Sequence, residues 1–443
     1  MTMPGKAPVA LLAALALASS CTTPPRPHDT PAGAGPATGA ATTAATSSTE
    51  AASPAGTPSP TASAGTAAAE AGPGPAPTGA PHTGPLAAFY DALRALERGQ
   101  RKRHVRIIWL GDSHAQADFW TGHIRTALQT RFGHGGPGFV HLGFKAYRHE
   151  GVDTEVKGSW RMRPKQPSTV DPWGDGAFGL GGILHAGYAG ARRASLTLTD
   201  ERLADRKLTW DLCFKYGLPY DRFRLQVGDG EPEILEASGK DDVGKLQHLT
   251  RVAKGLATLE VVPTNGRPDF CGVVIETDPA EHPGVVLDNL GINGARYGTA
   301  LAWNEAAWAE EVKRRDPELF IFEYGGNEAG DGIIKPREYR QQALELIARA
   351  KRIQPGAACL VIGPADRADA ESKIPPIRNV IREAAAEAEC QFWDTYDKMG
   401  GRGSLRTWRD DDRAAPDGVH LRPKGYAELG ALLLSDLMAG YAP

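Results

Sequence analysis

Regular hydrophobic patterning begins about eighty-five residues into the chain. Apolar residues recur at helical spacing over Leu86–Glu97, which predicts a helix there. His104–Leu110 is almost continuously apolar and predicts a buried strand. Gly111 ends this strand, and helical spacing then resumes and continues to Phe132. The folded part of the protein is therefore expected to open with a helix, a strand and a second helix.

The same alternation returns from about residue 284. The predicted strands there are Val285–Leu287, Leu319–Phe322, Cys359–Ile362 and Gln391–Trp393. The predicted helices are Tyr339–Arg352, Ile377–Ala388 and Pro423–Met438. Strands that alternate with helices imply a parallel sheet covered by helices on both faces. We therefore expect one α/β domain made of residues 85–147 and 284–443.

The residues between these two parts have a different pattern. From about 148 to 283 the apolar residues fall into short β-prone segments, and no long helical period occurs. The clearest segments are Ala194–Leu198, Lys207–Phe214, Arg222–Val227 and Leu256–Val262. We expect residues 148–283 to form an all-β sandwich inserted into the α/β domain after its first strand and helix.

The first 84 residues are not expected to fold. The apolar run Ala7–Ala18 is too short to span a bilayer and is typical of a secretory signal peptide. Cys21 directly follows small residues and resembles the lipidated cysteine of bacterial lipoproteins, so residues 1–21 are predicted to be a lipoprotein-type signal peptide. Residues 22–84 are mostly Ala, Pro, Thr, Ser and Gly and should form a disordered linker. The protein is therefore expected to be exported and lipid-anchored in the bacterial cell envelope, in the periplasm or on the outer surface.

Composition and charge narrow the range of partners. With 443 residues and a net charge of -3, the chain has no basic excess that would suggest nucleic acid as a partner. Apart from Cys21 there are four cysteines, which allow three pairings, so buried free thiols and one or two disulfides both stay open. They are Cys213, Cys271, Cys359 and Cys390. No cysteine or histidine cluster has the spacing of a zinc site, so no metal is expected.

The sequence after the first predicted strand is Gly111-Asp112-Ser113-His114. A side chain there lies at the carboxyl edge of a parallel sheet, where open α/β folds bind ligands. The amides that start the following helix also stabilise negative charge. Ser113 is therefore a candidate nucleophile, although serine is equally suited to cap a helix. His114 either packs at the helix start or takes part in catalysis.

A candidate base occurs near the carboxyl end. Asp417 and His420 lie three residues apart in a turn before the last predicted helix. This spacing lets the carboxylate bind one ring nitrogen while the other faces outward, as a base for a serine hydroxyl requires. The alternative is a surface pair without a function.

Two further segments follow predicted strands and offer donors for an oxyanion. Tyr324–Glu328 contains Asn327, whose side-chain amide can donate, and Asn289–Ala295 contains glycines that let a backbone amide approach a substrate. Taken singly, Asn327 could cap a helix and the glycines could merely turn the chain. Four such pieces in this order are more specific than any one of them.

Together these segments resemble the conserved blocks of the SGNH (GDSL-type) hydrolase superfamily. Gly111-Asp112-Ser113 resembles the first block and Gly294 the second, with Gly291 as an alternative alignment. Gly325-Gly326-Asn327 resembles the third block, and Asp417-Gly418-Val419-His420 the last. The resemblance implies a flavodoxin-like three-layer α/β domain with a parallel sheet between helices.

The resemblance also implies a role for each residue. Ser113 would be the nucleophile, His420 the general base and then acid, and Asp417 its orienter. The oxyanion hole would consist of the amides of Ser113 and Gly294 and the side chain of Asn327. The implied chemistry needs no metal or organic cofactor.

Within the superfamily the chain looks most like the peptidoglycan O-acetylesterases, in which a carbohydrate-binding-like β domain interrupts the hydrolase domain. The likeness rests on Gly-Asp-Ser-His, on Asp118-Phe119 soon after it, and on the position of the β insert. It implies a serine esterase that removes O-acetyl groups from a cell-envelope polysaccharide, with peptidoglycan as the first candidate. The alternatives are a polysaccharide O-acetyltransferase with the same triad and an acetylxylan-type esterase.

The expected partners are an O-acetylated glycan and, through Cys21, a membrane. No protein partner is predicted. Aromatic residues of the insert either stack on sugar rings or form its core. They are Trp160, Trp173, Tyr188 and Trp210.

Overall fold

The computed structural model describes residues 84–441 except 146, 166–173, 191 and 240. The predicted signal peptide (1–21), Cys21, the linker up to residue 83 and Trp173 lie outside the described residues. Within the described part, no helix is both long enough and apolar enough to cross a membrane.

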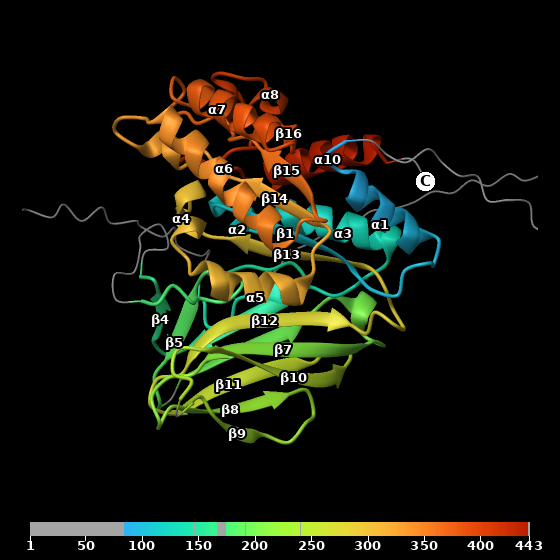
Figure 1. The fold of residues 1–443 in the computed structure, drawn as a ribbon, viewed down its shortest axis with the longest axis vertical. Coiled ribbons are helices and arrows are strands. Elements are labelled where there is room, and N and C mark those ends of the chain that lie inside the picture. Colours follow the sequence, from blue (N-terminus) through green and yellow to red (C-terminus); the bar gives the residue numbers. More distant parts are fainter. Residues whose placement is uncertain (1–83, 146, 166–173, 191, 240, 442–443) are drawn as a thin grey trace, which may run out of the picture. The chain divides into compact units, whose positions relative to one another are not determined.

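A five-stranded parallel sheet forms the centre of the α/β domain (Figure 1). Its strands are β1 (Val105–Gly111), β13 (Val285–Gly291), β14 (Leu319–Glu323), β15 (Ala358–Ile362) and β16 (Gln391–Trp393). The order across the sheet is β13-β1-β14-β15-β16, and every neighbouring pair is parallel. This is the flavodoxin-like order, in which the first strand lies between the second and the third. The predicted fold class is confirmed.

Helices cover both faces of this sheet. The helices that follow the strand–helix alternation are α1 (Ala87–Glu97), α3 (Trp120–Phe132), α5 (Glu305–Arg315), α6 (Pro336–Ile353), α7 (Ile374–Glu387) and α10 (Pro423–Ala439). Apolar residues of α1, α3 and α10 share one core with one face of the sheet, and those of α5, α6 and α7 share another with the opposite face. Helix α5 was not predicted, because Trp308 and Val312 are its only large buried apolar residues among many charged ones.

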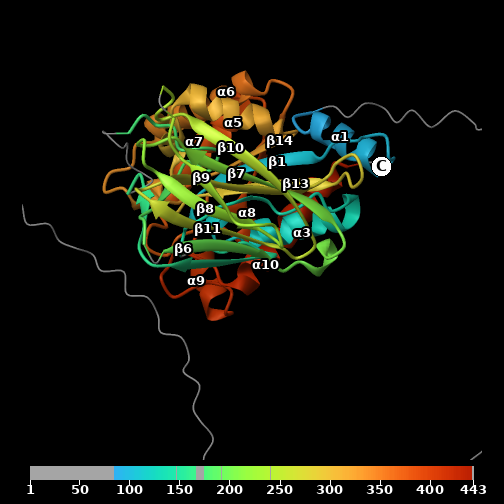
Figure 2. The same ribbon diagram turned by 90° about the horizontal axis from the view of Figure 1, so that it is seen from below.

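The insert consists of two antiparallel sheets around a core of its own (Figure 2). One sheet has the order β10-β7-β12-β5-β4, with β2 added on β12, and the other has the order β3-β6-β11-β8-β9. The strands of the first sheet are β2 (Gly138–Val140), β4 (Trp160–Arg163), β5 (Leu184–Gly187), β7 (Lys207–Lys215), β10 (Leu246–Lys254) and β12 (Asp269–Thr277). Those of the second are β3 (Val152–Lys157), β6 (Arg193–Leu198), β8 (Arg222–Val227), β9 (Glu233–Glu236) and β11 (Thr258–Asn265).

The pairing of β2 bears on where the insert begins. Gly138–Val140 already pairs with β12, so the sandwich includes a strand that precedes the predicted boundary at 148. Trp210 is fully buried in the sandwich core and therefore cannot stack on a sugar. Trp160 packs on Phe270 at a ring distance of 5.8 Å.

All four cysteines of the described part form disulfides. Cys213–Cys271 joins β7 to β12, and Cys359–Cys390 joins β15 to the residue before β16. These bonds are one of the three pairings that the sequence left open. The alternative, that the four cysteines are buried free thiols, is wrong.

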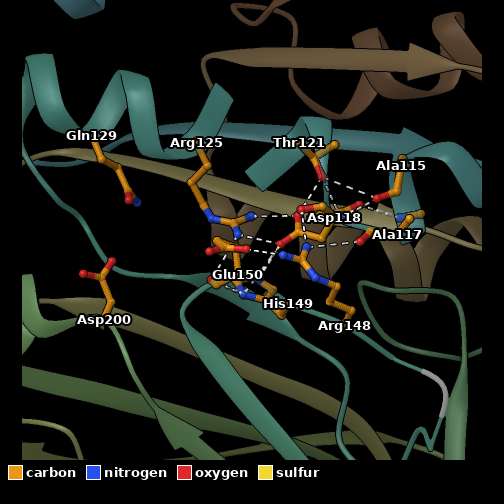
Figure 3. Close-up of polar contacts among 12 residues, drawn as sticks. Ala115, Ala117, Asp118, Thr121, Arg125, Gln129, Arg148, His149, Glu150 and Asp200 are labelled. Carbon is orange, nitrogen blue, oxygen red and sulfur yellow. Dashed lines mark hydrogen bonds and ion pairs between the residues drawn. The ribbon is translucent and has the colours of Figure 1, made fainter. Parts of the chain in front are cut away.

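The buried carboxylate of Asp118 connects the start of the α/β domain to the insert and to β13 (Figure 3). It accepts from Thr121 Oγ1 at 2.6 Å and from both terminal nitrogens of Arg125 at 3.0 and 2.6 Å. It also accepts from the amide of Glu150 at 2.7 Å and from Asn289 Nδ2 at 3.0 Å. Asp118 thus holds α3, the entry to the insert and the end of β13 at one point.

The ion pair between Asp118 and Arg125 sets the protonation of this carboxylate. Burial alone would raise the pKa of Asp118, but the Arg125 guanidinium, which is also buried, outweighs it and holds the pKa well below its usual range. A lowered pKa in the folded state stabilises the fold above the unfolded pKa, and this contribution is lost as the pH falls through the folded pKa.

We expect Asp118→Asn to lower the free energy of unfolding by about 3–5 kcal/mol at neutral pH, because it leaves the Arg125 charge buried without a counter-ion. The loss should shrink in strongly acidic solution, where the parent carboxylate is also neutral. Urea unfolding followed by circular dichroism measures both effects. Asp153→Asn, on the exposed side of β3, is the matched control and should change the value by less than about 0.5 kcal/mol. Equal effects of the two substitutions would contradict the role of Asp118.

Candidate active site

The carboxyl ends of β13, β1 and β14 bring three of the predicted segments together. Ser113 follows β1, Gly294 follows β13 and Asn327 follows β14, and these three strands are neighbours in the sheet. In a flavodoxin-like sheet the chain leaves β1 and β14 in opposite directions, and the crevice that opens there is the usual ligand site.

The short helix α2 (Ser113–Gln116) presents the serine hydroxyl at this edge. Its N-cap is Asp112, whose Oδ1 accepts from the amide of His114 at 2.9 Å. Since Asp112 caps the helix, the alternative role of Ser113 as the cap is wrong. Ser113 Oγ instead lies 2.8 Å from His420 Nε2.

The other ring nitrogen of His420 is held by Asp417. His420 Nδ1 lies 2.7 Å from Asp417 Oδ2. Asp417 Oδ1 accepts from the amides of Val419 and His420, both at 2.9 Å. Gly418 has φ of 77°, a left-handed conformation that closes this turn and that glycine adopts without strain. The turn thus orients the carboxylate toward the imidazole, and Ser113, His420 and Asp417 form a continuous hydrogen-bonded relay.

The relay is open to solvent. The side chains of His420 and Asp417 are 40% and 49% exposed. Partial burial would raise the pKa of Asp417, but hydrogen bonds from the backbone and the ring of His420 outweigh it and hold the pKa below its usual value. Asp417 therefore stays ionised beside the imidazole, as an orienting group must.

His114 packs beneath the relay. It is buried, its ring lies 5.4 Å from that of His420, and its Nδ1 lies 3.0 Å from Tyr426 Oη. Burial, and then the neighbouring His420, lowers the pKa of His114 to about 3. Of its two predicted roles, these contacts favour packing, since a neutral buried ring supports His420 without a second charge.

Asn327 is hydrogen-bonded to the residue that precedes the serine. Its Nδ2 donates to Ala295 O at 3.0 Å and to Asp112 Oδ2 at 3.3 Å. Asn327 stands at the N-cap of a short 3₁₀ turn, but its side chain makes no capping bond. The amide is therefore held at the carboxyl edge of β14 instead of serving as a helix cap.

Two residues that sequence reasoning missed hold the turn around Asn327. The fully buried carboxyl of Glu328 accepts from the amides of Gly325 at 3.1 Å and Tyr297 at 3.2 Å, and burial raises its pKa to about 7. Arg367 donates to Gly326 O at 2.7 Å. Glu328 is adjacent to the third block, but nothing in its local pattern separates it from a surface glutamate, and Arg367 has no sequence signal at all.

The two glycines after β13 differ in what they can offer. The amide of Gly291 donates to Asn289 Oδ1 at 3.0 Å, and a Cβ at Gly291 would collide with the backbone of Gln116. Gly294 has φ of 78°, and a Cβ there would meet no atom within 4 Å. Gly291 is thus used for close packing, whereas Gly294 faces open space, which favours the alignment that uses Gly294.

One further cluster of potential ligands lies away from this edge. Ligand atoms of Cys213, His248 and Glu311 lie within 4.8 Å of one another. Cys213 is bonded to Cys271, and His248 bridges Asp211 at 3.0 Å and Glu311 at 2.9 Å. The disulfide removes the thiolate that a metal would need, so this group does not fit a metal site.

Comparison with known proteins identifies the domain. The model of the GDSL-like Lipase/Acylhydrolase family matches residues 264–428, which include Gly294, Asn327, Asp417 and His420. The chain contains a GDSL-like lipase/acylhydrolase domain. The enzyme class expected from the sequence, a carboxylic ester hydrolase, is confirmed.

The match begins at residue 264, inside the insert, and does not include β1 and Ser113. β1 and Ser113 precede residue 264 in the chain but lie beside β13 and β14 in the fold. The block that contains Ser113 is therefore joined to the GDSL-like domain by strand pairing.

Among solved structures, that of a peptidoglycan O-acetylesterase is similar over 80% of this chain and 95% of its own, with 26% identity and a TM-score of 0.65. A lipase/acylhydrolase from Enterococcus faecalis is 22% identical over 36% of this chain and 79% of its own, with a TM-score of 0.30. A family two carbohydrate esterase from Cellvibrio japonicus is 10% identical over 66% of this chain and 98% of its own, with a TM-score of 0.28. No curated protein matches the chain in sequence.

We expect Asn327→Ala to lower kcat on an aryl acetate by about a hundredfold to a thousandfold, because it removes one donor to the oxyanion. The protein should still fold, since the carboxyl of Glu328 continues to hold the turn. Initial rates with p-nitrophenyl acetate, together with a thermal melt, measure both. Asn265→Ala, at the exposed end of β11 in the insert, is the control and should keep the parent rate. Activity of Asn327→Ala within a few-fold of the parent would rule out this role.

Proposed function

We propose that this protein is an exported serine esterase that removes O-acetyl groups from a cell-envelope polysaccharide, namely peptidoglycan. The observation that carries the proposal is the relay from Ser113 Oγ through His420 to Asp417, with Asn327 held beside it. A hydroxyl, an oriented imidazole and an amide donor at one edge are the parts that acyl transfer through a serine requires.

In the first step Ser113 Oγ attacks the carbonyl carbon of the acetyl ester while His420 Nε2 takes the hydroxyl proton. The tetrahedral oxyanion accepts hydrogen bonds from the amides of Ser113 and Gly294 and from Asn327 Nδ2. The amide of Ser113 starts helix α2, so it has no acceptor within the helix and is available for this bond. Protonated His420 then gives its proton to the sugar oxygen, which leaves as a hydroxyl.

In the second step water hydrolyses the acetyl-enzyme. His420 now accepts a proton from water, and the hydroxide attacks the acetyl carbonyl. The second tetrahedral intermediate collapses, Ser113 recovers its proton from His420, and acetate leaves. Asp417 holds the imidazole in the same tautomer and orientation in both steps.

Two observations support a polymeric glycan as the substrate. The similarity to the peptidoglycan O-acetylesterase extends over 80% of this chain, more than the α/β domain alone contains. The half-exposed relay is also reachable by an acetyl group on a long chain, which a closed pocket would exclude.

The envelope location rests on the amino-terminal sequence and on the disulfides. A signal peptide that ends at Cys21 would place a lipid on that cysteine, and the linker up to residue 84 would tether the enzyme to a membrane. Two disulfides in the folded part agree with an oxidising compartment.

We expect the purified protein to release acetate from O-acetylated peptidoglycan, and Ser113→Ala to release none above the blank. Acetylated xylan should be a poorer substrate, because the proposal assigns the site to an envelope polymer. Acetate release measured enzymatically on both polymers tests this. Faster release from xylan would instead favour an acetylxylan-type esterase. Transfer of the acetyl group to an added oligosaccharide, instead of release of free acetate, would favour an O-acetyltransferase.

We expect Cys21→Ser to move the protein from the membrane fraction to the soluble fraction of the cell envelope, because one lipidated residue carries the whole attachment. Immunoblots of fractionated cells measure the shift. Ser20→Ala keeps a small residue before the cysteine and is the matched control, which should stay with the membrane. A Cys21→Ser protein that remains in the membrane fraction would contradict the anchor.

A further inference from the structure

Two buried carboxyl groups lie next to the end of β1, just before the nucleophile, and neither takes part in the two steps of acyl transfer. Asp112 follows β1, and Glu323 is the last residue of β14, where it is aligned with Gly111 on the neighbouring strand. The two residues are only 2% and 6% exposed. Among the described residues, no lysine or arginine forms an ion pair with either of them.

The hydrogen bonds around this pair are unevenly distributed. Asp112 accepts from the amide of His114 at 2.9 Å and from Asn327 Nδ2 at 3.3 Å. Glu323 Oε2 is buried and has no hydrogen-bond partner among the described residues, while the backbone amides of Asp112 and Ala115 face the same carboxyl and oppose the rise of its pKa. A Cβ on Gly111 would lie 2.5 Å from this oxygen, so the carboxyl of Glu323 fills the space that glycine leaves open.

A shared proton accounts for this arrangement. The carboxyl of Glu323 reaches the Gly111–Asp112 segment, because Glu323 is paired with Gly111 in the sheet, and a hydrogen bond between the carboxyls of Asp112 and Glu323 requires that one of the two is protonated. Two ionised carboxylates side by side in a buried site would repel each other strongly, whereas one shared proton allows a strong hydrogen bond. In this arrangement the protonated carboxyl of Glu323 donates a hydrogen bond to the carboxylate of Asp112.

The surroundings place that proton on Glu323. Burial, and then the charge of Asp112, raises the pKa of Glu323 well above its usual range. Burial raises the pKa of Asp112 only to about 6, because the amide of His114 opposes it. The other charged or titratable groups that face the pair are His114, Tyr297, Tyr324, Glu328, Arg367, His420 and Tyr426.

The pair acts on the oxyanion hole through Asn327. Both hydrogens of Asn327 Nδ2 have acceptors, one on Ala295 O at 3.0 Å and one on Asp112 Oδ2 at 3.3 Å. An oxyanion must therefore compete for one of them, and the longer bond to Asp112 is the one to yield. The strength of the hydrogen bond from Asn327 to Asp112 depends on the negative charge of Asp112. A hydrogen bond donated by Glu323 spreads that charge and weakens the bond.

We propose that Glu323 is a positioning residue that stays protonated and donates to Asp112, so that Asp112 aligns Asn327 and still releases one N–H to the oxyanion. The pair then carries one negative charge behind the oxyanion hole instead of two. This role rests on the proposed function, because it presupposes that Asn327 stabilises an oxyanion. Loss of the proton in alkaline solution should lower kcat.

The test compares Glu323→Gln with Glu323→Ala on p-nitrophenyl acetate from neutral to alkaline pH. Glutamine keeps a neutral donor toward Asp112, so kcat should stay within about threefold of the parent and its alkaline decline should disappear. Alanine removes the donor, so kcat should fall by about tenfold or more while KM changes little. Thermal melts show that each variant is folded.

An infrared spectrum provides a readout that does not depend on activity, and it decides the question if Glu323→Ala fails to fold. The difference spectrum between the parent and Glu323→Gln at neutral pH should contain the C=O band of one protonated buried carboxyl, since Glu328, whose pKa is about 7, contributes equally to both proteins. Glu318→Gln is the matched control, since this buried glutamate lies just before the other end of β14 and is paired with Arg103 at 2.7 Å. It should alter neither that band nor the pH profile.

The outcomes separate this inference from the proposed function. If the parent has no esterase activity that depends on Ser113, the proposed function fails and the role of Glu323 fails with it. If that activity is present but Glu323→Gln keeps the alkaline decline, or the infrared band is missing from the difference between the parent and Glu323→Gln, only the role of Glu323 is overturned. Parent-like kcat in folded Glu323→Ala would overturn it as well.

Discussion

The buried carboxylate of Asp118 is the contact on which the geometry of the site depends. It sits between α2 and α3 with φ of 51°, a left-handed conformation that aspartate tolerates better than most side chains. Its bonds to Arg125, Glu150 and Asn289 connect three segments that are far apart in the chain. Asn289 also donates to the carbonyl of Ala115 at 2.8 Å, so the helix that begins at Ser113 is fixed from the same point.

Acidic groups recur wherever a loop of the site must keep its shape. The carboxyl of Glu328 binds two amides around the Asn327 turn, Asp112 caps the nucleophile helix, and Asp417 binds the amides of its own turn before it reaches His420. Each of these groups replaces the water that would otherwise satisfy backbone donors. The loops are therefore rigid although they lie outside the regular helices and strands. Rigidity of this kind holds hydrogen-bond donors in place before charge develops in a transition state.

The sequence alone predicts the fold class and the candidate relay for different reasons. The buried strands of a parallel sheet are continuous apolar runs, and Asp417 and His420 are close in sequence, so both leave a local signal. Helix α5 left none, because most of its surface is polar. The contact between Asp112 and Glu323 depends on the register of β1 against β14, which are separated by the whole insert. The pairing of β2 with β12 is equally long-range, which explains why the insert boundary was difficult to predict.

The position of β1 in the sheet determines the order in which the domain can form during synthesis. Both neighbours of β1 are made after the insert: Val105 pairs with Val285, and Ile107 pairs with Leu319. While the insert is being synthesised, the apolar strand that precedes Ser113 therefore has no sheet to join. Pairings this distant in sequence form slowly, because a long loop must close before any contact offsets its entropy. The sandwich can close first and bring the two halves of the α/β domain together, so the insert would also act as an internal folding template for the enzyme.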